Sequence, residues 1–324
     1  MKMRYFDFKL LAGLFIILVL LFYFYGPISE HVYSLQPTYL LLGFLTLLSV
    51  VTIKQAKWYT LLGEIRNRRL AFKSYFTGQF VNEIAPIGTG DLTKAYMVRR
   101  YSKKSFGFAF ALPYMERVVD ITILGTFAIL SSLFLFLTTI SSYVSIVFVL
   151  VFVLALGFLL TALFPIKIAI TAKKIMEFLR KIIHVRLIEK IISKLEIFIL
   201  EISKDFQEAL KAFGGRKMLI FAMLLMALCD WVLEGVCQFF LINALGYSIP
   251  VLASVGIVSI SWLVSIPLMI PSGLGIRETV FSLLFVSFGV PFSAALVSML
   301  IYRGLVVIVF GSGALISLKI KNTQ

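Results

Sequence analysis

The sequence predicts an all-α integral membrane protein with about seven spanning helices, broken or re-entrant hairpins and an inverted-topology repeat. Three observations lead to this prediction: long apolar runs, blocks of basic residues between those runs, and a P-x-G-x-G motif that occurs twice. The chain has 324 residues, of which 60% are hydrophobic. Several of its apolar runs are long enough to cross about 30 Å of hydrocarbon, which indicates a membrane protein.

The apolar runs define seven candidate spans. They cover residues 10–25, 39–53, 113–137, 145–164, 218–241, 251–270 and 292–318. The first run resembles the apolar part of a signal peptide, but no small-x-small cleavage site follows it before Gly26. We therefore interpret it as a retained span.

Basic residues fall in blocks between the spans. Lys and Arg occupy residues 2–9, a loop at 54–73, and residues 94–104, 167–217 and 319–321, whereas none occurs around Glu30, Ser142, Gly246 and Val290. The positive-inside rule places the basic blocks and both termini in the cytoplasm and the other segments outside. Membrane orientation therefore explains the formal charge of +15, and we expect no nucleic-acid partner. The predicted location is the plasma membrane of a prokaryote.

The stretch at residues 74–93 lies between two cytoplasmic segments, so it crosses the membrane either not at all or twice. About 20 residues are too few for two full spans, but they suit a hairpin that enters the bilayer and turns back. We place this hairpin at residues 74–98, with "NEIAPIGTGDLTKAY" from Asn82 as its tip and return limb. Irregular backbone at that depth requires either burial by protein or a water-filled cavity, so the motif predicts a cavity.

The tip motif occurs a second time. Pro86, Gly88 and Gly90 form the first copy, and Pro271, Gly273 and Gly275 form the second. An arginine follows each copy in the next apolar run, Arg117 at 27 residues after Gly90 and Arg303 at 28 residues after Gly275. A second hairpin at residues 251–290 would enter from outside, which gives an inverted-topology repeat typical of secondary transporters. The alternative is a chance match, because Gly and Pro are common in membrane helices.

These features divide the chain into three parts. Residues 1–165 form an N-terminal membrane repeat, residues 166–216 a basic connector, and residues 217–324 a C-terminal membrane repeat. Apolar residues recur three or four positions apart in the connector, which predicts an amphipathic helix on the anionic cytoplasmic leaflet. A docking site for a partner enzyme is the alternative interpretation.

Ionisable residues within apolar context are candidates for function, because a charge at a helix centre costs at least roughly 2.5 to 3.5 kcal/mol. Glu116 and Asp120 share one helix face, as do Asp230 and Glu234. Seven acids face only three arginines, which predicts protonated carboxylates, a bound cation or a positively charged substrate group. Purely structural ion pairs are the alternative.

The glycines of both motifs permit tight turns and close approach of backbone to a ligand. Helices that begin just after the tips would direct their N-terminal amides at an anion such as a phosphate headgroup. Alternatively, the tips only pack against each other. The candidates for substrate binding and gating are Asn82, Glu83, Pro86, Gly88, Gly90, Asp91, Lys94, Glu116, Arg117, Asp120, Pro271, Gly273, Gly275, Arg277, Glu278 and Arg303, with Asp230 and Glu234 as secondary candidates.

The sequence contains no P-loop and no H-E-x-x-H, C-x-x-C or G-x-S-x-G motif. Its two histidines, His31 and His184, lie far apart, and no cysteine lies close to either. We therefore expect no catalytic residues, no metal and no cofactor.

The chain resembles a flippase-like family typified by the transmembrane region of lysylphosphatidylglycerol synthases. The residues that carry the resemblance are "WYTLLGEIRNR" from Trp58, the hairpin motif from Asn82, "ERVVD" from Glu116, "IPSGLGIRE" from Ile270 and "YRG" from Tyr302. The resemblance implies translocation of a polar-headed lipid, which is an aminoacylated phospholipid or a polyprenyl-phosphate-linked sugar.

Two departures from the family pattern affect this expectation. The usual G-E-x-x-R at the first tip is here Gly90, Asp91 and Lys94, which removes the guanidinium fork and puts bidentate phosphate recognition at Lys94 in doubt. The chain also ends at Gln324, directly after the last span, so we expect a stand-alone member without the aminoacyl-transferase domain.

Three functions are compatible with these features. The favoured one is an ATP-independent lipid flippase that is not an enzyme, in which Arg117, Arg277 and Arg303 hold phosphate and the carboxylates gate or carry protons. The second is an enzyme that modifies a lipid headgroup with the same carboxylates as acid and base. The third is a non-catalytic membrane subunit of a glycosyltransferase or synthetase. The expected partners are a membrane lipid and such an enzyme, and an oligomer is compatible with the sequence.

Overall fold

The structure is a computed structural model, and it describes residues 35–65, 67–85, 88–138, 215–266 and 273–319, together with single positions at 153, 156, 208, 209, 211 and 213. Over these residues the protein is all-α, as predicted. The elements are α3 (Pro37–Leu61), the short 3-10 helix η1 (Gly63–Ile65), α4 (Arg68–Ile84), α5 (Thr89–Ser102), α6 (Phe106–Thr138), α10 (Lys217–Ala244), α11 (Val251–Ser265), α12 (Ile276–Val286) and α13 (Phe292–Lys319).

Five of the seven candidate spans fall on described helices. In the described part of the chain, α3, α10 and α13 are long and apolar enough to cross a membrane. The 33-residue α6 is longer still, but it carries three charged residues near its middle. The remaining helix, α11, has only 15 residues, so it is shorter than a full span. The spans expected at residues 10–25 and 145–164, and nearly all of the connector at 166–216, lie outside the described residues.

The loop predicted to begin at Lys54 was wrong, because α3 continues through Leu61. Lys54 and Lys57 therefore lie inside a membrane helix, and Lys57 has no solvent exposure. Carboxylates on neighbouring helices compensate both ammonium groups, so the charges do not end the helix. The positive-inside rule failed at Lys54 and Lys57, because it assigns lysines to cytoplasmic loops and these two lie within a helix.

Helices α3 and α10 form a long antiparallel pair. The backbone amide of Gln36 at the start of α3 donates to the carbonyl of Ala244 at the end of α10, with an N to O distance of 2.8 Å. At the opposite end, Arg216 pairs with Glu64. Between these ends Gly43 lets the helices approach, because a Cβ there would lie 3.0 Å from Leu241. The pair thus forms a continuous wall through the bundle.

Helices α4 and α5 form a helical hairpin. Gly88 makes the turn with a φ of 90°, a left-handed conformation that favours glycine. The two limbs touch through Gly78 and Gly90, where a Cβ on Gly90 would lie 1.9 Å from the carbonyl oxygen of Gly78. The predicted hairpin at residues 74–98 therefore corresponds to two helices in close backbone contact.

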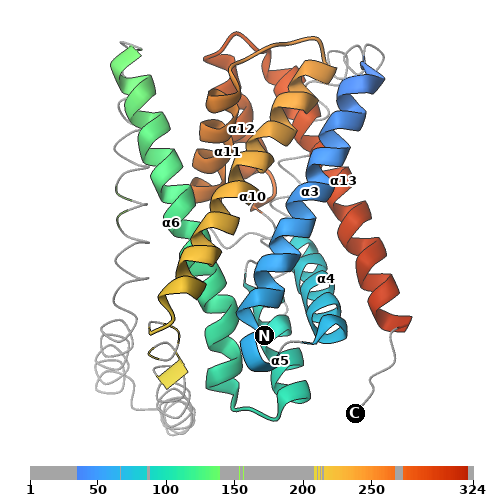
Figure 1. The fold of residues 1–324 in the computed structure, drawn as a ribbon. Coiled ribbons are helices and arrows are strands. Elements are labelled where there is room, and N and C mark those ends of the chain that lie inside the picture. Colours follow the sequence, from blue (N-terminus) through green and yellow to red (C-terminus); the bar gives the residue numbers. More distant parts are fainter. Residues whose placement is uncertain are drawn as a thin grey trace, which may run out of the picture.

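A second helix pair, α11 and α12, occupies the opposite half of the molecule. Figure 1 shows α4 and α5 in the lower half and α11 and α12 in the upper half. Gly273 and Gly275, which precede α12, both have positive φ. Each pair is followed by a long helix, α6 after the first and α13 after the second. The first limb of each pair packs against the long helix of the other, α4 on α13 and α11 on α6.

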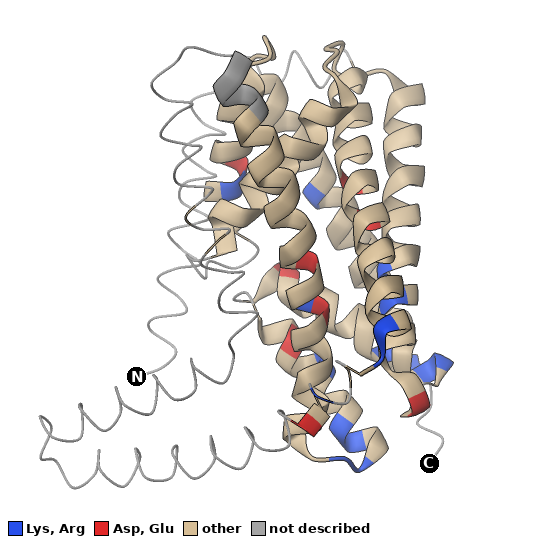
Figure 2. Ribbon diagram, turned by 60° about the vertical axis from the view of Figure 1, so that its left-hand side comes forward, with Lys and Arg blue, Asp and Glu red and all other residues tan. Residues whose placement is uncertain are grey.

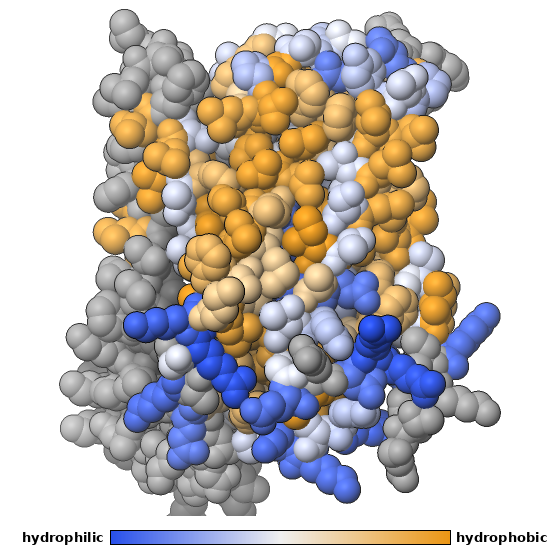
Figure 3. Space-filling view, viewed as in Figure 1, coloured by the Kyte–Doolittle hydropathy of each residue, from blue (hydrophilic) through white to orange (hydrophobic). Residues whose placement is uncertain are grey.

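The surface combines an apolar band with one basic end. Figure 3 shows hydrophobic side chains over the middle of the molecule and hydrophilic ones at both ends, with the most strongly hydrophilic at the lower end. In Figure 2 most of the coloured Lys and Arg residues also lie at this end, where α4 and α5 are found in Figure 1. This pattern suits a bundle whose middle contacts lipid and whose ends lie at the membrane surfaces.

Candidate functional site

A cavity of about 80 Å³ lies inside the bundle, between the C-terminal ends of α4 and α11. Its charged lining residues are Lys54 from α3, Glu83 from α4, Lys94 from α5, Glu116, Arg117 and Asp120 from α6, and Glu234 from α10. Aromatic side chains complete the wall: Trp231, Trp262, Tyr302 and Phe310. The cavity predicted from the irregular hairpin tip is therefore present, and it combines ionised and aromatic groups.

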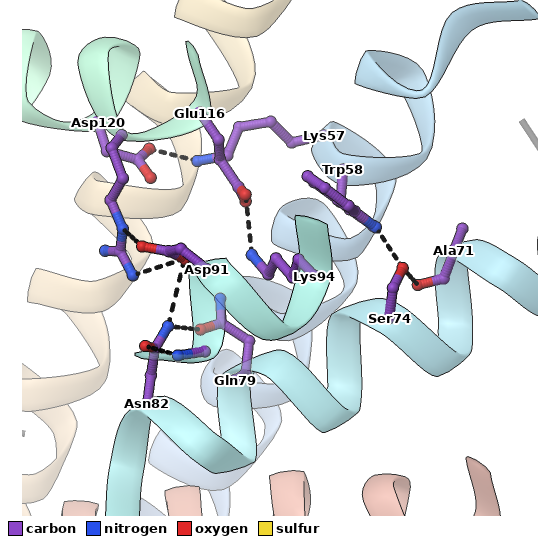
Figure 4. Close-up of polar contacts among 12 residues, drawn as sticks. Lys57, Trp58, Ala71, Ser74, Gln79, Asn82, Asp91, Lys94, Glu116 and Asp120 are labelled. Carbon is purple, nitrogen blue, oxygen red and sulfur yellow. Dashed lines mark hydrogen bonds and ion pairs between the residues drawn. The ribbon is translucent and has the colours of Figure 1, made fainter. Parts of the chain in front are cut away.

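Lys57 is the most deeply buried cation beside the cavity. Its ammonium group pairs with Asp120 of α6 and lies 2.7 Å from Oδ2 of Asp230 on α10. Lys57 and Asp230 have no solvent exposure, and the Asp120 side chain is 11% exposed. Figure 4 shows Lys57 reaching Asp120 across the space between their helices. One lysine thus joins three helices that are distant in sequence.

A second lysine, one turn away, joins two of these helices, α3 and α10. The ammonium of Lys54 lies 3.1 Å from Oε2 of Glu234 and 4.7 Å from the ring centre of Trp231. The hydroxyl of Tyr302 on α13 donates to Oε1 of Glu234. Both oxygens of Glu234 are therefore bonded, and its charge is matched by one cation.

Lys94 of the first hairpin is held inside the protein. Its ammonium lies 2.8 Å from Oε2 of Glu116 and 4.9 Å from the ring centre of Trp58. The indole of Trp58 in turn donates to the hydroxyl of Ser74 at 2.8 Å. The charge of Lys94 therefore already has a partner. The ion pair and the cation–π contact hold the first hairpin against α6 and α3.

Asp91 forms the centre of a polar network at the first tip. Arg117 of α6 contacts both of its carboxylate oxygens, at 2.8 Å from Nε and 3.3 Å from the terminal nitrogen. Asn82 donates to Asp91 at 3.4 Å and accepts from the amide of Gly90 at 2.9 Å. Figure 4 shows Asn82, Asp91 and Gln79 converging at the tip. The network joins both limbs of the hairpin to α6.

The second tip repeats the pairing of a carboxylate with an arginine. Glu278 at the start of α12 pairs with Arg303 on α13, and its other oxygen accepts from the amide of Gly275 at 2.8 Å. The guanidinium of the adjacent Arg277 stacks on Trp262, with 3.9 Å from its central carbon to the ring centre. In each half, an acid in the first turn after the tip glycines therefore pairs with an arginine on the following long helix.

Most of the candidate residues are gathered in this region. Asn82, Glu83, Lys94, Glu116, Arg117, Asp120 and Glu234 line the cavity, while Asp91, Asp230, Glu278, Arg277 and Arg303 lie in ion pairs or stacks next to it. Gly88, Gly273 and Gly275 serve the tip turns, and Gly90 serves the contact between the limbs. Pro86 and Pro271 lie outside the described residues.

Two lysines of the candidate site were missed by the sequence reasoning. Lys54 and Lys57 were assigned to a loop. Their helical spacing from the buried apolar residues of α3 could have placed them on the same face of that helix. With Lys94 they add three cations to the three arginines, against seven acids. The predicted excess of carboxylates is therefore reduced to one negative charge among these side chains.

The site offers paired charges and aromatic surfaces. Within the described part of the chain, no cluster of His, Cys, Asp and Glu side chains could hold a metal ion. Paired charges at helix junctions can exchange partners when a polar group enters, and aromatic faces can bind its cationic part. The arrangement is thus suited to holding a charged molecule inside an apolar bundle.

The fold and the site define a multi-helix membrane protein with a charged interior. The model of the family described as "Lysylphosphatidylglycerol synthase TM region" matches residues 10–313. The chain belongs to this family. It is also similar to the UPF0104 membrane protein MJ1595 of Methanocaldococcus jannaschii, with 23% identity over 295 residues that cover 88% of this chain and 85% of the relative. No solved structure was found to match the chain.

Proposed function

We propose that the protein is a lipid flippase that moves a polar- or phosphate-headed lipid between leaflets without nucleotide hydrolysis. The observation that carries the proposal is the cavity of ion pairs and aromatic rings at the junction of two helix pairs from opposite halves of the molecule. Family membership supports a role in lipid metabolism of the membrane. The lipid would be an aminoacyl-phospholipid or a polyprenyl-phosphate-linked sugar.

An inverted-topology repeat is part of the proposal. The units would be α3 to α6 and α10 to α13, each with a helix pair followed by a long helix. The exchanged packing of α4 on α13 and α11 on α6, and the Asp91–Arg117 and Glu278–Arg303 pairs, support it. Such a repeat permits alternating access, because rocking one half against the other exposes a central site to each side in turn.

The headgroup would enter by displacing existing ion-pair partners. A cavity of about 80 Å³ holds a few water molecules but not a headgroup, so the hairpins must separate for binding. Arg117 is the natural first phosphate ligand, because it lines the cavity and its side chain is 36% exposed. Arg277 and Arg303 would join it from the second tip, and Asp91 would rebind Arg117 after release.

We place the protein in the plasma membrane of a prokaryote, with the basic end and both termini in the cytoplasm. The gathering of basic side chains at one end of the molecule supports this orientation. The substrate would be supplied by a membrane-associated enzyme that attaches an amino acid or a sugar to a lipid. The protein itself would leave the lipid chemically unchanged.

Proteoliposomes test the proposal directly. Purified protein would be reconstituted with fluorescent phosphatidylglycerol, its lysyl ester or a polyprenyl-phosphate sugar, and lipid arrival in the outer leaflet would be followed by quenching. We expect wild-type protein to accelerate the movement of at least one lipid, and Asp91→Asn and Arg277→Ala to abolish the acceleration. Glu64→Gln, which removes an exposed carboxylate far from the cavity, should behave as wild type.

Two results would replace the proposal. A chemically altered lipid, detected by mass spectrometry after incubation with protein alone, would indicate an enzyme. Unaltered lipid and no acceleration from folded protein would favour a non-catalytic subunit of a glycosyltransferase or synthetase. Deletion of Lys173 to Lys211 would then be expected to abolish cellular activity while the tip variants retain it.

A further inference from the structure

The Lys57 cluster carries an unbalanced charge inside the bundle. One ammonium group lies between two carboxylates, Asp120 and Asp230, so the three side chains have a net charge of −1 when all are ionised. Lys57 contacts Oδ2 of Asp230, while Oδ1 of Asp230 is buried and has no hydrogen-bond partner among the residues that the structure describes. A carboxylate oxygen in this position is poorly solvated, because it is closed to bulk solvent and no donor from the described residues reaches it.

The ion pair of Lys54 and Glu234, which also joins α3 and α10, has no such excess charge. Glu234 lies one turn beyond Asp230 on α10, and Lys54 lies one turn before Lys57 on α3. Lys54 and Tyr302 bond the two oxygens of Glu234, so that carboxylate is fully satisfied. Asp230 is as deeply buried, but it shares the ammonium group of Lys57 with Asp120. The imbalance is therefore local to Asp230.

The groups that face Asp230 come from several helices. Helix α3 presents Lys54 and Lys57, and α6 presents Asp120, with Glu116 one turn earlier. On α10 itself the nearest ionisable group is Glu234, which Tyr302 of α13 and the charge of Arg277 on α12 stabilise. Helix α11, which packs on α10, has no ionisable side chain. Glu116 is already paired with Lys94. Lys54 and Lys57 thus oppose three carboxylates, those of Asp120, Asp230 and Glu234, and addition of one proton removes the excess negative charge.

We propose that Asp230 is a proton-binding residue, with the Lys57–Asp120 pair as its gate to the cavity. A proton from cavity water enters past Asp120, which lines the cavity, and binds Asp230, whose carboxylate becomes a neutral carboxyl group. Lys57 keeps its proton and pairs with Asp120, so the cluster changes from −1 to neutral. Release reverses these steps and returns one proton to water.

Proton binding would be coupled to helix movement. Lys57 is the electrostatic link between α6 and α10, and neutral Asp230 holds its ammonium far less strongly. The link between α10 and the α3–α6 pair would therefore weaken when the proton binds. This coupling rests on the proposed flippase function, in which α6 and α10 belong to opposite halves. Proton binding by Asp230 is independent of that function.

Infrared difference spectroscopy of the reconstituted full chain tests proton binding without any lipid substrate. As the pH is lowered, we expect a carbonyl band of a protonated buried carboxyl group to appear in wild-type protein and in Glu64→Gln. The band should be absent from Asp230→Asn. A band of equal intensity in folded Asp230→Asn would overturn the assignment, as would its absence from wild type over the whole range in which the protein stays folded.

A pH gradient across the same proteoliposomes tests the coupling. If one proton moves with each lipid, a gradient of one pH unit should shift the ratio of fluorescent phosphatidylglycerol between leaflets by up to about tenfold. In Asp230→Asn the ratio should no longer follow the gradient, while Glu64→Gln should follow it as wild type does. Wild-type translocation that is indifferent to the gradient would overturn the coupling.

The outcomes separate this inference from the flippase proposal. Titration of Asp230 without translocation of any lipid supports the proton site and contradicts the flippase. Translocation without a titrating carboxyl group or gradient dependence supports the flippase and overturns the proton site. If Asp230→Asn fails to fold, the gradient dependence of wild type and the loss of the band in Asp120→Asn decide the question.

Discussion

At the scale of single residues, the interior is organised by lysines that are fully surrounded by protein. Lys94 is 1% exposed and pairs with Glu116 at 2.8 Å beneath the ring of Trp58. Burial of both charges opposes much of the attraction between them, so such a pair contributes little net stability relative to an apolar pair. Loss of one partner is costly, because it leaves the other charge unpaired.

We predict that Lys94→Met lowers the free energy of unfolding by about 3 to 5 kcal/mol, because it leaves Glu116 without its cation. The double variant Lys94→Met, Glu116→Gln should recover most of that loss. Unfolding in detergent, followed by circular dichroism, measures both. Glu64→Gln breaks an exposed pair with Arg216 and should change stability by about 0 to 1 kcal/mol. Equal losses in the single and double variants would contradict the pairing.

The sequence indicated which acids and arginines lie in the interior, but not how they pair. The sequence left ion pairs open as an alternative, and the structure pairs Arg117 with Asp91 and Arg303 with Glu278. Lys57 could not be placed, because charge counting treats every lysine near a helix end as cytoplasmic. Its partners are 63 and 173 residues away, and only the packed bundle brings them together.

At the scale of elements, the first hairpin depends on the contact between its limbs. Gly78 and Gly90 allow α4 and α5 to touch through their backbones. This contact positions Asn82 to bond the amide of Gly90 and to support Asp91. The geometry of the candidate site at this tip is therefore set by two glycines, one of them outside the P-x-G-x-G motif.

Gly90→Ala is predicted to destabilise the protein by about 1 to 3 kcal/mol, because its Cβ would collide with the carbonyl oxygen of Gly78. Gly304→Ala is the matched control, since a Cβ there meets nothing within 4 Å and Ala favours a helix by up to about 1 kcal/mol. Thermal unfolding in detergent compares the two. A Gly90→Ala variant as stable as Gly304→Ala would argue against the close contact.

The start of α4 provides a second test at this scale. The side chain of Asn67 accepts hydrogen bonds from the amides of Arg69 and Leu70, so Asn67→Ala should cost about 1 kcal/mol. Gln36 occupies the same position before α3 without a side-chain cap, and Gln36→Ala should be nearly neutral. Because Asn67 also donates to the hydroxyl of Tyr101, Tyr101→Phe separates that bond from the cap. Thermal unfolding measures the stability of both variants. If Gln36→Ala were less stable than Asn67→Ala, the capping role of Asn67 would be contradicted.

At the scale of the whole molecule, the described residues contain two helix pairs, each followed by a long helix, and the division of the chain into two membrane repeats stays a prediction. The repeated motif and the following arginine were visible because each lies in a short stretch of sequence. The exchanged packing of α4 on α13 and α11 on α6 was not visible, since such contacts depend on shape and not on local pattern. The span expected at residues 251–270 contains α11, which has only 15 residues, because composition alone does not distinguish a short apolar helix from part of a full span.

Labelling of single cysteines is predicted to place the two ends of the bundle on opposite sides of the membrane. Ser105 lies exposed in the α5–α6 connection, and Ser248 lies exposed between α10 and α11 at the other end of the bundle. With Cys229 and Cys237 replaced by serine, an impermeant maleimide should label Ser248→Cys in intact cells and Ser105→Cys only after permeabilisation. Basic residues flank Ser105 and none flanks Ser248, so the positive-inside rule requires this order. Labelling of both from one side would contradict a spanning bundle, and the reverse order would invert the direction of access assigned to each hairpin.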